Sequence, residues 1–211
     1  MVDTVKRDAD VEEELEGAEP AALTQRLLQL ALERLERLPA DELSLRALAQ
    51  ELGVSHQAPY VHFGSRRRFL AAVAGVGLQE AAEQARLRVA AAGADPVARL
   101  HALAEAYLDF IRTRPHVHDL AYGPAVAKAD HPLLQQAAIS SWGLLHDSVS
   151  ACQAPGTDEE DVLRRSAIVW GTVYGLARLT TFRQVPTSVP GDADSLVHGA
   201  LDGLVAGWRA G

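Results

Sequence analysis

Apolar residues recur at intervals of three and four positions along almost the whole chain, and this helical period limits the fold more than any other feature. Strands would instead show alternation between apolar and polar residues, which almost no segment does. Proline, glycine and aspartate separate one periodic segment from the next. We therefore expect an all-α protein of about nine helices, the first of them at residues 22–38 and ended by Pro39.

Size and composition favour one self-sufficient, non-exported protein. The chain has 211 residues, of which 48% are hydrophobic, so it can form a hydrophobic core and fold without disulfide bonds. The single cysteine, Cys152, excludes an internal disulfide and a cysteine zinc site, and we interpret it as a small buried side chain. No run reaches the roughly 20 apolar residues of a membrane-spanning helix, and the start lacks a signal peptide's apolar stretch. These features predict a cytoplasmic protein that does not bind membranes.

The first 20 residues differ from the rest in charge. They contain eight acidic and two basic residues, which accounts for −6 of the chain's net charge of −8. Such a segment buries too little apolar surface to fold, and we expect residues 1–20 to form a disordered acidic tail. The net charge of the chain therefore says little about its folded part.

Two short helices joined by a tight turn are predicted between residues 44 and 63. Serines are good N-caps, so Ser44 is expected to start a helix that ends at Leu52, and Ser55 a helix that ends at Phe63. Gly53 supplies the left-handed residue that ends the first of them. This pattern is typical of a helix-turn-helix, whose second helix lies in the major groove of DNA. Pro59, the fourth residue after Ser55, forfeits one early helical hydrogen bond, and we find no physical reason in the sequence for a proline there.

Positive charge is concentrated directly after this turn. Gly64 and Ser65 interrupt the chain, and Arg66, Arg67 and Arg68 then open a helix that runs to about Ala92. Arginines in a first turn oppose the helix dipole, which becomes reasonable when a phosphate binds there. Residues 71–211 carry eleven basic and fifteen acidic residues, so the basic patch is local. A surface hairpin with solvated arginines is the alternative, but the caps, turn and charges occur in one register.

The stretch "LSLRALAQELGVSHQAPYVHFGSRRRFLAAV", residues 43–73, resembles the DNA-binding region of TetR/AcrR-type transcriptional regulators. Its Ala-Pro-Tyr variant, with Pro59 in the middle, resembles a subgroup whose C-terminal region is named for a Trp…His-Gly motif. In this chain that motif would be "WGTVYGLARL", residues 170–179, where Tyr174 and Gly175 replace His-Gly. The departure concerns the role of that histidine and not the fold.

The resemblance implies two kinds of contact with operator DNA. Phosphate contacts and the caps that position them are expected from Thr24, Ser44, Arg46, Tyr60, His62, Arg66 and Arg67. Base edges would be contacted by the exposed start of the recognition helix, namely Ser55, His56, Gln57 and Ala58. Gln57 is the strongest candidate because its amide can pair with adenine through two hydrogen bonds. For His56, a solvated surface side chain is the equal alternative.

The remainder of the chain is expected to form a ligand-binding and dimerisation domain. We place the DNA-binding domain at residues 21–70 and this second domain at residues 71–211, with helices near 96–113, 117–126, 132–150, 158–182 and 192–208. The resemblance implies a homodimer formed by the last two helices and a pocket for a small molecule. Bulky side chains with a polar end suit such a pocket, and the candidates are Tyr107, Phe110, Tyr122, Trp142, His146, Trp170 and Tyr174. The chain's acidity favours a neutral or cationic ligand.

Catalysis is not indicated by any motif. There is no phosphate-binding glycine loop and no Gly-x-Ser-x-Gly elbow, so we expect neither an enzyme nor a cofactor. We interpret "HVHD", residues 116–119, as a polar helix start rather than a metal site. The sequence therefore predicts a ligand-responsive DNA-binding regulator, a repressor that a small molecule releases from a pseudo-palindromic operator. The alternative is a helical module that binds small molecules or proteins but not specific DNA.

Overall fold

A computed structural model describes residues 21–210, and all regular secondary structure in this range is helical. The predicted all-α class is therefore confirmed. The predicted acidic tail, residues 1–20, lies outside the described residues. Within residues 21–210, the helices are all too short or too polar to cross a membrane.

The N-terminal helices form the predicted helix-turn-helix. A first helix ends at residue 35, three residues before the predicted end, and a turn occupies residues 36–38. Helix α2 (Leu45–Glu51) is capped by the Ser44 hydroxyl, which accepts a hydrogen bond from the Ala47 N–H at 3.3 Å. Gly53 then turns the chain with a φ of +69°, the left-handed conformation expected of it.

Helix α3 (Ala58–Phe63), the recognition helix by its place in the motif, begins two residues later than predicted, because its N-cap is Gln57 and not Ser55. The Ser55 hydroxyl accepts a hydrogen bond from the Gln57 N–H at 3.2 Å and so caps a preceding turn rather than the helix. Because α3 begins at Ala58, Pro59 is the second residue of its first turn, where the backbone N–H has no partner within the helix. Pro59 therefore costs α3 no hydrogen bond, which resolves its unexplained position in the sequence.

Helix α4 (Arg66–Ala91) joins the two parts of the molecule. The Ser65 hydroxyl caps it by accepting from the Arg68 N–H at 3.2 Å, as predicted. Its first half is buried in a core that also includes residues of the first helix, α2 and α3. A Cβ atom at Gly75 would lie 2.5 Å from the backbone nitrogen of Leu134, so glycine is required for the close approach of the next layer. The predicted boundary at residue 70 thus falls inside one continuous helix and one continuous core.

Five further α-helices and one short 3-10 helix follow α4. Their bounds are α5 (Pro96–Thr113), α6 (Pro115–Tyr122), η1 (Lys128–Asp130), α7 (Pro132–Ser150), α8 (Glu159–Thr181) and α9 (Ala193–Ala210). The starts of α5 and α7 match the prediction because a proline occupies the first turn of each. Helix α6 begins earlier and ends earlier than expected, and η1 was not predicted.

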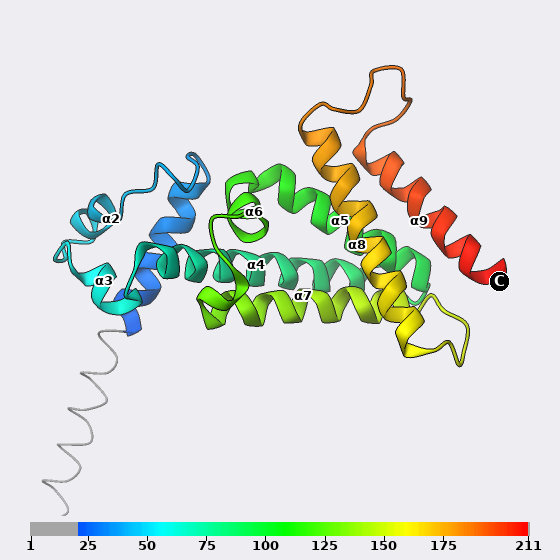
Figure 1. The fold of residues 1–211 in the computed structure, drawn as a ribbon, viewed down its shortest axis with the longest axis horizontal. Coiled ribbons are helices and arrows are strands. Elements are labelled where there is room, and N and C mark those ends of the chain that lie inside the picture. Colours follow the sequence, from blue (N-terminus) through cyan, green and yellow to red (C-terminus); the bar gives the residue numbers. More distant parts are fainter. Residues whose placement is uncertain (1–20, 211) are drawn as a thin grey trace, which may run out of the picture.

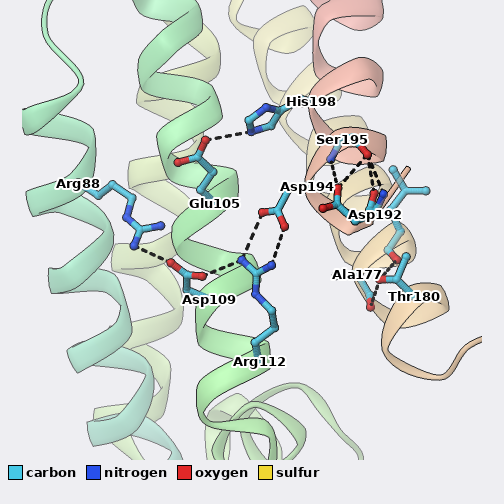
Figure 2. Close-up of polar contacts among 11 residues, drawn as sticks. Arg88, Glu105, Asp109, Arg112, Ala177, Thr180, Asp192, Asp194, Ser195 and His198 are labelled. Atoms are coloured by element: carbon cyan, nitrogen blue, oxygen red, sulfur yellow. Dashed lines mark hydrogen bonds and ion pairs between the residues drawn. The ribbon is translucent and has the colours of Figure 1, made fainter. Parts of the chain in front are cut away.

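The helices are arranged along one long axis. Figure 1 shows α2 and α3 at one end of the molecule and α8 and α9 toward the opposite end, with α4 and α7 packed side by side between them. A second core, formed by α5, α7, α8 and α9, fills the far end. Charged side chains hold α5 between its neighbours: Asp109 of α5 contacts Arg88 of α4 at 2.6 Å, and Arg112 of α5 contacts Asp194 of α9 at 2.6 Å (Figure 2).

Candidate functional site

The recognition helix presents a row of side chains to solvent. His56 and Gln57 are exposed in the turn before α3, and Tyr60 is 44% exposed on α3 itself. Val61 is 79% exposed, a position that the sequence pattern left ambiguous between core and surface. An exposed valine is suited to apolar contact with a thymine methyl group. The geometry therefore brings the predicted base-edge residues together and adds Val61 to them.

Contacts on the buried side of α3 hold this helix against the rest of the protein. Phe63 is buried with its ring 4.9 Å from that of Phe69 in α4, in an edge-to-face arrangement. His62 Nδ1 lies 3.4 Å from Thr24 Oγ1, so two predicted phosphate contacts are in fact neighbours of each other. The predicted base-edge residue Ala58 is half-buried, and the Ser55 hydroxyl is already used by its turn. His56 and Gln57 remain the exposed candidates before α3 whose side chains have no such internal role.

Arg66 has a structural task that the sequence did not reveal. Its Nη2 donates to the carbonyl of Ala40 at 2.6 Å and lies 3.3 Å from the carbonyls of Asp41 and Leu43. The guanidinium therefore holds the start of α4 against the loop that precedes α2. A phosphate contact from Arg66, as predicted from the sequence, would have to use its other nitrogens. Its first role is to position the helix-turn-helix.

Two other arginines are better placed for phosphate. Arg46 in the first turn of α2 and Arg68 in the first turn of α4 are exposed, and within residues 21–210 no carboxylate lies within ion-pair distance of either. Both lie close to the recognition helix in sequence and on the same part of the fold. Arg46 was predicted as a contact, whereas Arg68 was not. An unpaired exposed guanidinium is the group that a DNA backbone attracts most readily.

A cavity of about 300 Å³ lies in the second half of the molecule. Side chains of α4, α5, α7 and α8 form its walls, and Tyr122 of α6 and Lys128 of η1 complete the lining. Five of the seven predicted ligand-binding residues line it: Tyr107, Phe110, Tyr122, Trp142 and Trp170. The volume is at the lower end of the range for small-molecule sites. The choice of bulky side chains thus found five residues of a pocket whose walls come from distant parts of the chain.

Two predicted pocket residues lie outside the lining. Tyr174 packs behind it, with its ring 5.8 Å from that of Trp170 and 6.3 Å from that of His118. His146 is turned toward the start of α8, where its Nε2 lies 3.0 Å from a carboxylate oxygen of Glu159. The prediction placed both residues correctly on helices α7 and α8. It did not predict where their side chains point, because that depends on the neighbouring helix.

A fully buried histidine supports the pocket wall. His118 of α6 has no exposed surface, and its Nε2 lies 2.8 Å from the Tyr107 hydroxyl. Burial lowers the pKa of His118, and it does so more strongly than Asp119 raises it from 3.5 Å away. Neutral His118 therefore accepts a hydrogen bond from the Tyr107 hydroxyl at Nε2 and carries its own proton on Nδ1, which faces Asp119. Asp119 in turn contacts Arg178 of α8. From the sequence, this segment was predicted only to be a polar helix start.

The connection between α6 and α7 links the pocket to the recognition helix. Lys128 lines the cavity, and two residues later Asp130 accepts a hydrogen bond from Arg67 Nε in the first turn of α4 at 2.6 Å. The ring of His131 lies 6.3 Å from that of Phe63, the last residue of α3. Residues 127–131, which we call the linking turn, therefore contact the ligand cavity at one end and the helix-turn-helix at the other.

Together, the fold and the two sites define an all-helical protein with an N-terminal helix-turn-helix and a ligand-sized cavity in its C-terminal part. Residues 100–204 match the family described as "Tetracyclin repressor-like, C-terminal domain". A search of curated proteins finds no match.

Solved structures share the fold over nearly the full length. A protein of unknown function from Rhodococcus sp. RHA1 is 31% identical, with a TM-score of 0.73 over 88% of this chain and 95% of that one. A TetR/AcrR family regulator from Thermobifida fusca YX-ER1 is 20% identical, with a TM-score of 0.58 over 89% and 99%. A TetR variant from Acinetobacter baumannii AYE, in complex with minocycline, is 21% identical, with a TM-score of 0.56 over 87% and 94%. The chain belongs to the TetR family, whose members are non-enzymatic transcriptional regulators.

Proposed function

We propose that the protein is a ligand-responsive repressor, released from a pseudo-palindromic operator when a small molecule enters the cavity. The observation that carries the proposal is the linking turn, because one short segment contacts both the cavity and the first turn of α4. A ligand that displaces this segment changes the position of the recognition helix. It can shift the equilibrium only by its different affinity for the DNA-binding and released states.

The DNA contacts divide into two groups. Arg46, Arg68 and Tyr60 bind phosphates and set the register, whereas Gln57, with His56 and Val61 beside it, reads base edges. Thr24 and His62 support the helix from its inner side through their mutual contact. Arg67 contacts a phosphate when it leaves Asp130. Arg66 maintains the shape of the motif through its contacts to the loop before α2.

A homodimer follows from the unpartnered face of α8 and α9. Leu163, Ile168, Leu179 and Phe182 of this region are between 41% and 53% exposed. A Cβ atom added at Gly171, Gly199, Gly203 or Gly207 would meet nothing within 4 Å. Exposed apolar side chains interspersed with small residues allow two helix pairs to approach closely. We propose that a second copy covers this face and sets the spacing of the two recognition helices.

The segment "WGTVYGLARL" is consistent with the Trp-His-Gly subgroup on one point. Trp170, the tryptophan of the motif, lines the cavity. Tyr174, which stands where the motif has a histidine, packs against Trp170. We propose membership of this subgroup. The related TetR structure holds minocycline, and we likewise propose a small organic molecule as the effector here. We also propose that the protein acts in the cytoplasm, where it would meet its DNA target.

The test is binding to the chain's own promoter region. Fluorescence anisotropy with labelled promoter fragments should show sequence-preferring binding whose affinity falls steeply with salt concentration, since several arginines contact phosphates. A shuffled fragment of equal length is the control. Absence of any preference for the promoter over the shuffled fragment would favour the alternative, a helical binding module that does not recognise specific DNA.

A further inference from the structure

The cavity differs in charge from the chain as a whole. Although the chain carries a net charge of −8, no carboxylate of residues 21–210 lines the cavity, and Lys128 is the one charged side chain that these residues contribute to its lining. The rest of the lining consists of alanine, leucine, valine and aromatic side chains with a single serine. The local environment that a ligand meets is therefore apolar with one positive charge at its edge.

A cation finds little to bind in this cavity. An ammonium group would lose its hydration without a carboxylate to replace it, which is costly in an apolar site. The aromatic rings offer no open cage either, because Tyr107, Tyr122 and Trp170 pack on one another. Their ring centroids lie 5.2 to 6.2 Å apart, and the pairs that include Tyr107 are edge to face. The polar hydroxyls of Tyr107 and Ser141 are also occupied, by His118 and by the Ala137 carbonyl.

An anion, in contrast, meets a cation without a partner. Lys128 is exposed at the linking turn, and no carboxylate in residues 21–210 lies within ion-pair distance of its ammonium group. The chain contains only one other lysine, Lys6, because eighteen of its twenty basic residues are arginines. A lysine can place its aliphatic stem along an apolar wall while its ammonium group stays at the water-accessible edge. Lys128 both lines the cavity and is exposed to solvent, as this arrangement requires.

We propose that the effector is an apolar acid. Its hydrocarbon body, aliphatic or aromatic, fills the cavity, and its carboxylate pairs with the ammonium group of Lys128. The proposal names the ligand class of the site proposed above and rests on that function only for its regulatory consequence. Because Lys128 and Asp130 belong to the same short helix, a carboxylate bound to Lys128 acts on the segment that holds Arg67.

Matched probes with different head groups test the ligand class. Decanoate, decanol and decyltrimethylammonium share one chain, and phenylbutyrate and phenylbutanol form a second, aromatic pair. Binding to the full-length protein is measured by tryptophan fluorescence, since Trp142 and Trp170 line the cavity. We expect both acids to bind about tenfold or more tightly than their alcohols, and the trimethylammonium probe to bind most weakly. Equal affinities, a preference for the cation, or no binding of either acid would overturn the proposal.

Variants at Lys128 separate its contribution from general apolar binding. K128M should weaken the acids by about tenfold and leave decanol unchanged, whereas K128R should retain most of the preference for acids. R99M, which removes an exposed arginine of α5, is the matched control and should change none of the affinities. Loss of decanol binding together with acid binding in K128M would show that Lys128 shapes the cavity and does not pair with the acid.

A spectroscopic signal reports the contact directly. Reductive methylation with ¹³C-formaldehyde labels only the amino terminus, Lys6 and Lys128, and K128R assigns the Lys128 resonance. Decanoate should shift that resonance and leave the Lys6 signal in place, and decanol should shift it less. An unmoved Lys128 signal at saturating decanoate would overturn the proposed pair.

DNA binding distinguishes this inference from the proposed function. If decanoate binds through Lys128 but the protein does not bind promoter DNA, the proposed ligand class is supported and the proposed regulatory function is wrong. If the protein binds its promoter and the acids show no preference over alcohols, the function stands and the ligand class fails.

Discussion

Arg67 Nε donates a hydrogen bond to Asp130 Oδ2 at 2.6 Å and thereby joins the first turn of α4 to the linking turn beside the cavity. The same carboxylate oxygen accepts the Ala127 N–H at 2.5 Å, so Asp130 both shapes its own turn and holds the arginine. These contacts lower the pKa of Asp130, the Ala127 N–H having the larger effect. Under the proposed function, Arg67 would exchange this carboxylate for a DNA phosphate when the protein binds its operator.

Removing the charge of Asp130 should release Arg67 for DNA. D130N keeps an oxygen that can accept the Ala127 N–H, and we expect it to raise promoter affinity several-fold at moderate salt concentration. R67M and the double variant R67M/D130N should then bind DNA with the same affinity as each other. Fluorescence anisotropy measures all three variants beside the original protein. A weaker D130N complex, or a further effect of D130N in the absence of Arg67, would contradict this sharing.

The division between phosphate and base contacts predicts two different defects. R46A should weaken binding to every DNA sequence and reduce the salt dependence of log K by about 0.9, the value for one phosphate contact. Q57A should instead relax the preference at particular base pairs and leave the salt dependence unchanged. Anisotropy titrations against a set of single-base operator variants measure both quantities. Identical behaviour of R46A and Q57A would refute the assignment.

The close contact at Gly75 predicts a specific loss of stability. G75A places a Cβ 2.5 Å from a backbone nitrogen of α7, and we expect a destabilisation of ~1–3 kcal/mol. G143A, also in a helix, meets nothing within 4 Å and should stabilise the protein by up to ~1 kcal/mol. Urea unfolding at neutral pH gives both free energies. If G75A were as stable as G143A, α4 and α7 would not pack as closely as described.

The buried histidine predicts a loss of stability in mild acid. Because burial lowers the pKa of His118, the folded protein binds fewer protons than the unfolded chain once the pH falls below about 6.5. The free energy of unfolding is therefore constant above that pH and decreases below it, by at most ~1.4 kcal/mol per pH unit from this group. H118Q, which retains an acceptor for Tyr107, should show a smaller decrease between pH 7.5 and 5.5.

The comparison of the two pH dependences isolates His118. The pKa of His131 is also lowered, by burial and then by Arg68, but His131 is present in both proteins and its contribution cancels. Urea unfolding curves at several pH values provide the measurement. Parallel pH dependences in H118Q and the original protein would show that His118 titrates normally.

Local signals in the sequence predicted the helices best where the backbone itself restricts them. Pro96 and Pro132 mark the starts of α5 and α7, and Ser44 and Ser65 cap the helices that they were expected to cap. The prediction that Ser55 caps α3 was wrong, because a serine hydroxyl can cap a turn as well as a helix. Here it caps the turn before α3. Choosing bulky side chains with a polar end also identified five of the aromatic residues in the cavity wall.

Contacts between distant segments were not predictable in the same way. Arg66 finds its carbonyl partner at Ala40, 26 residues earlier, and no local pattern indicates that choice. His118 lies in a segment with three polar residues out of four, yet the packing of α6 against α4 and α5 buries it completely. The charge of the cavity likewise depends on which helices meet there, and it differs in sign from the net charge of the chain.

We propose that two copies of the chain bind a symmetric operator. Hydroxyl-radical footprinting on the promoter region tests it most directly, because it shows both the location and the symmetry of the contacts. We predict two protected segments related by an inverted repeat, with centres one helical turn of DNA, or a whole number of turns, apart. A single unsymmetric footprint, or uniform protection without sequence preference, would contradict the account.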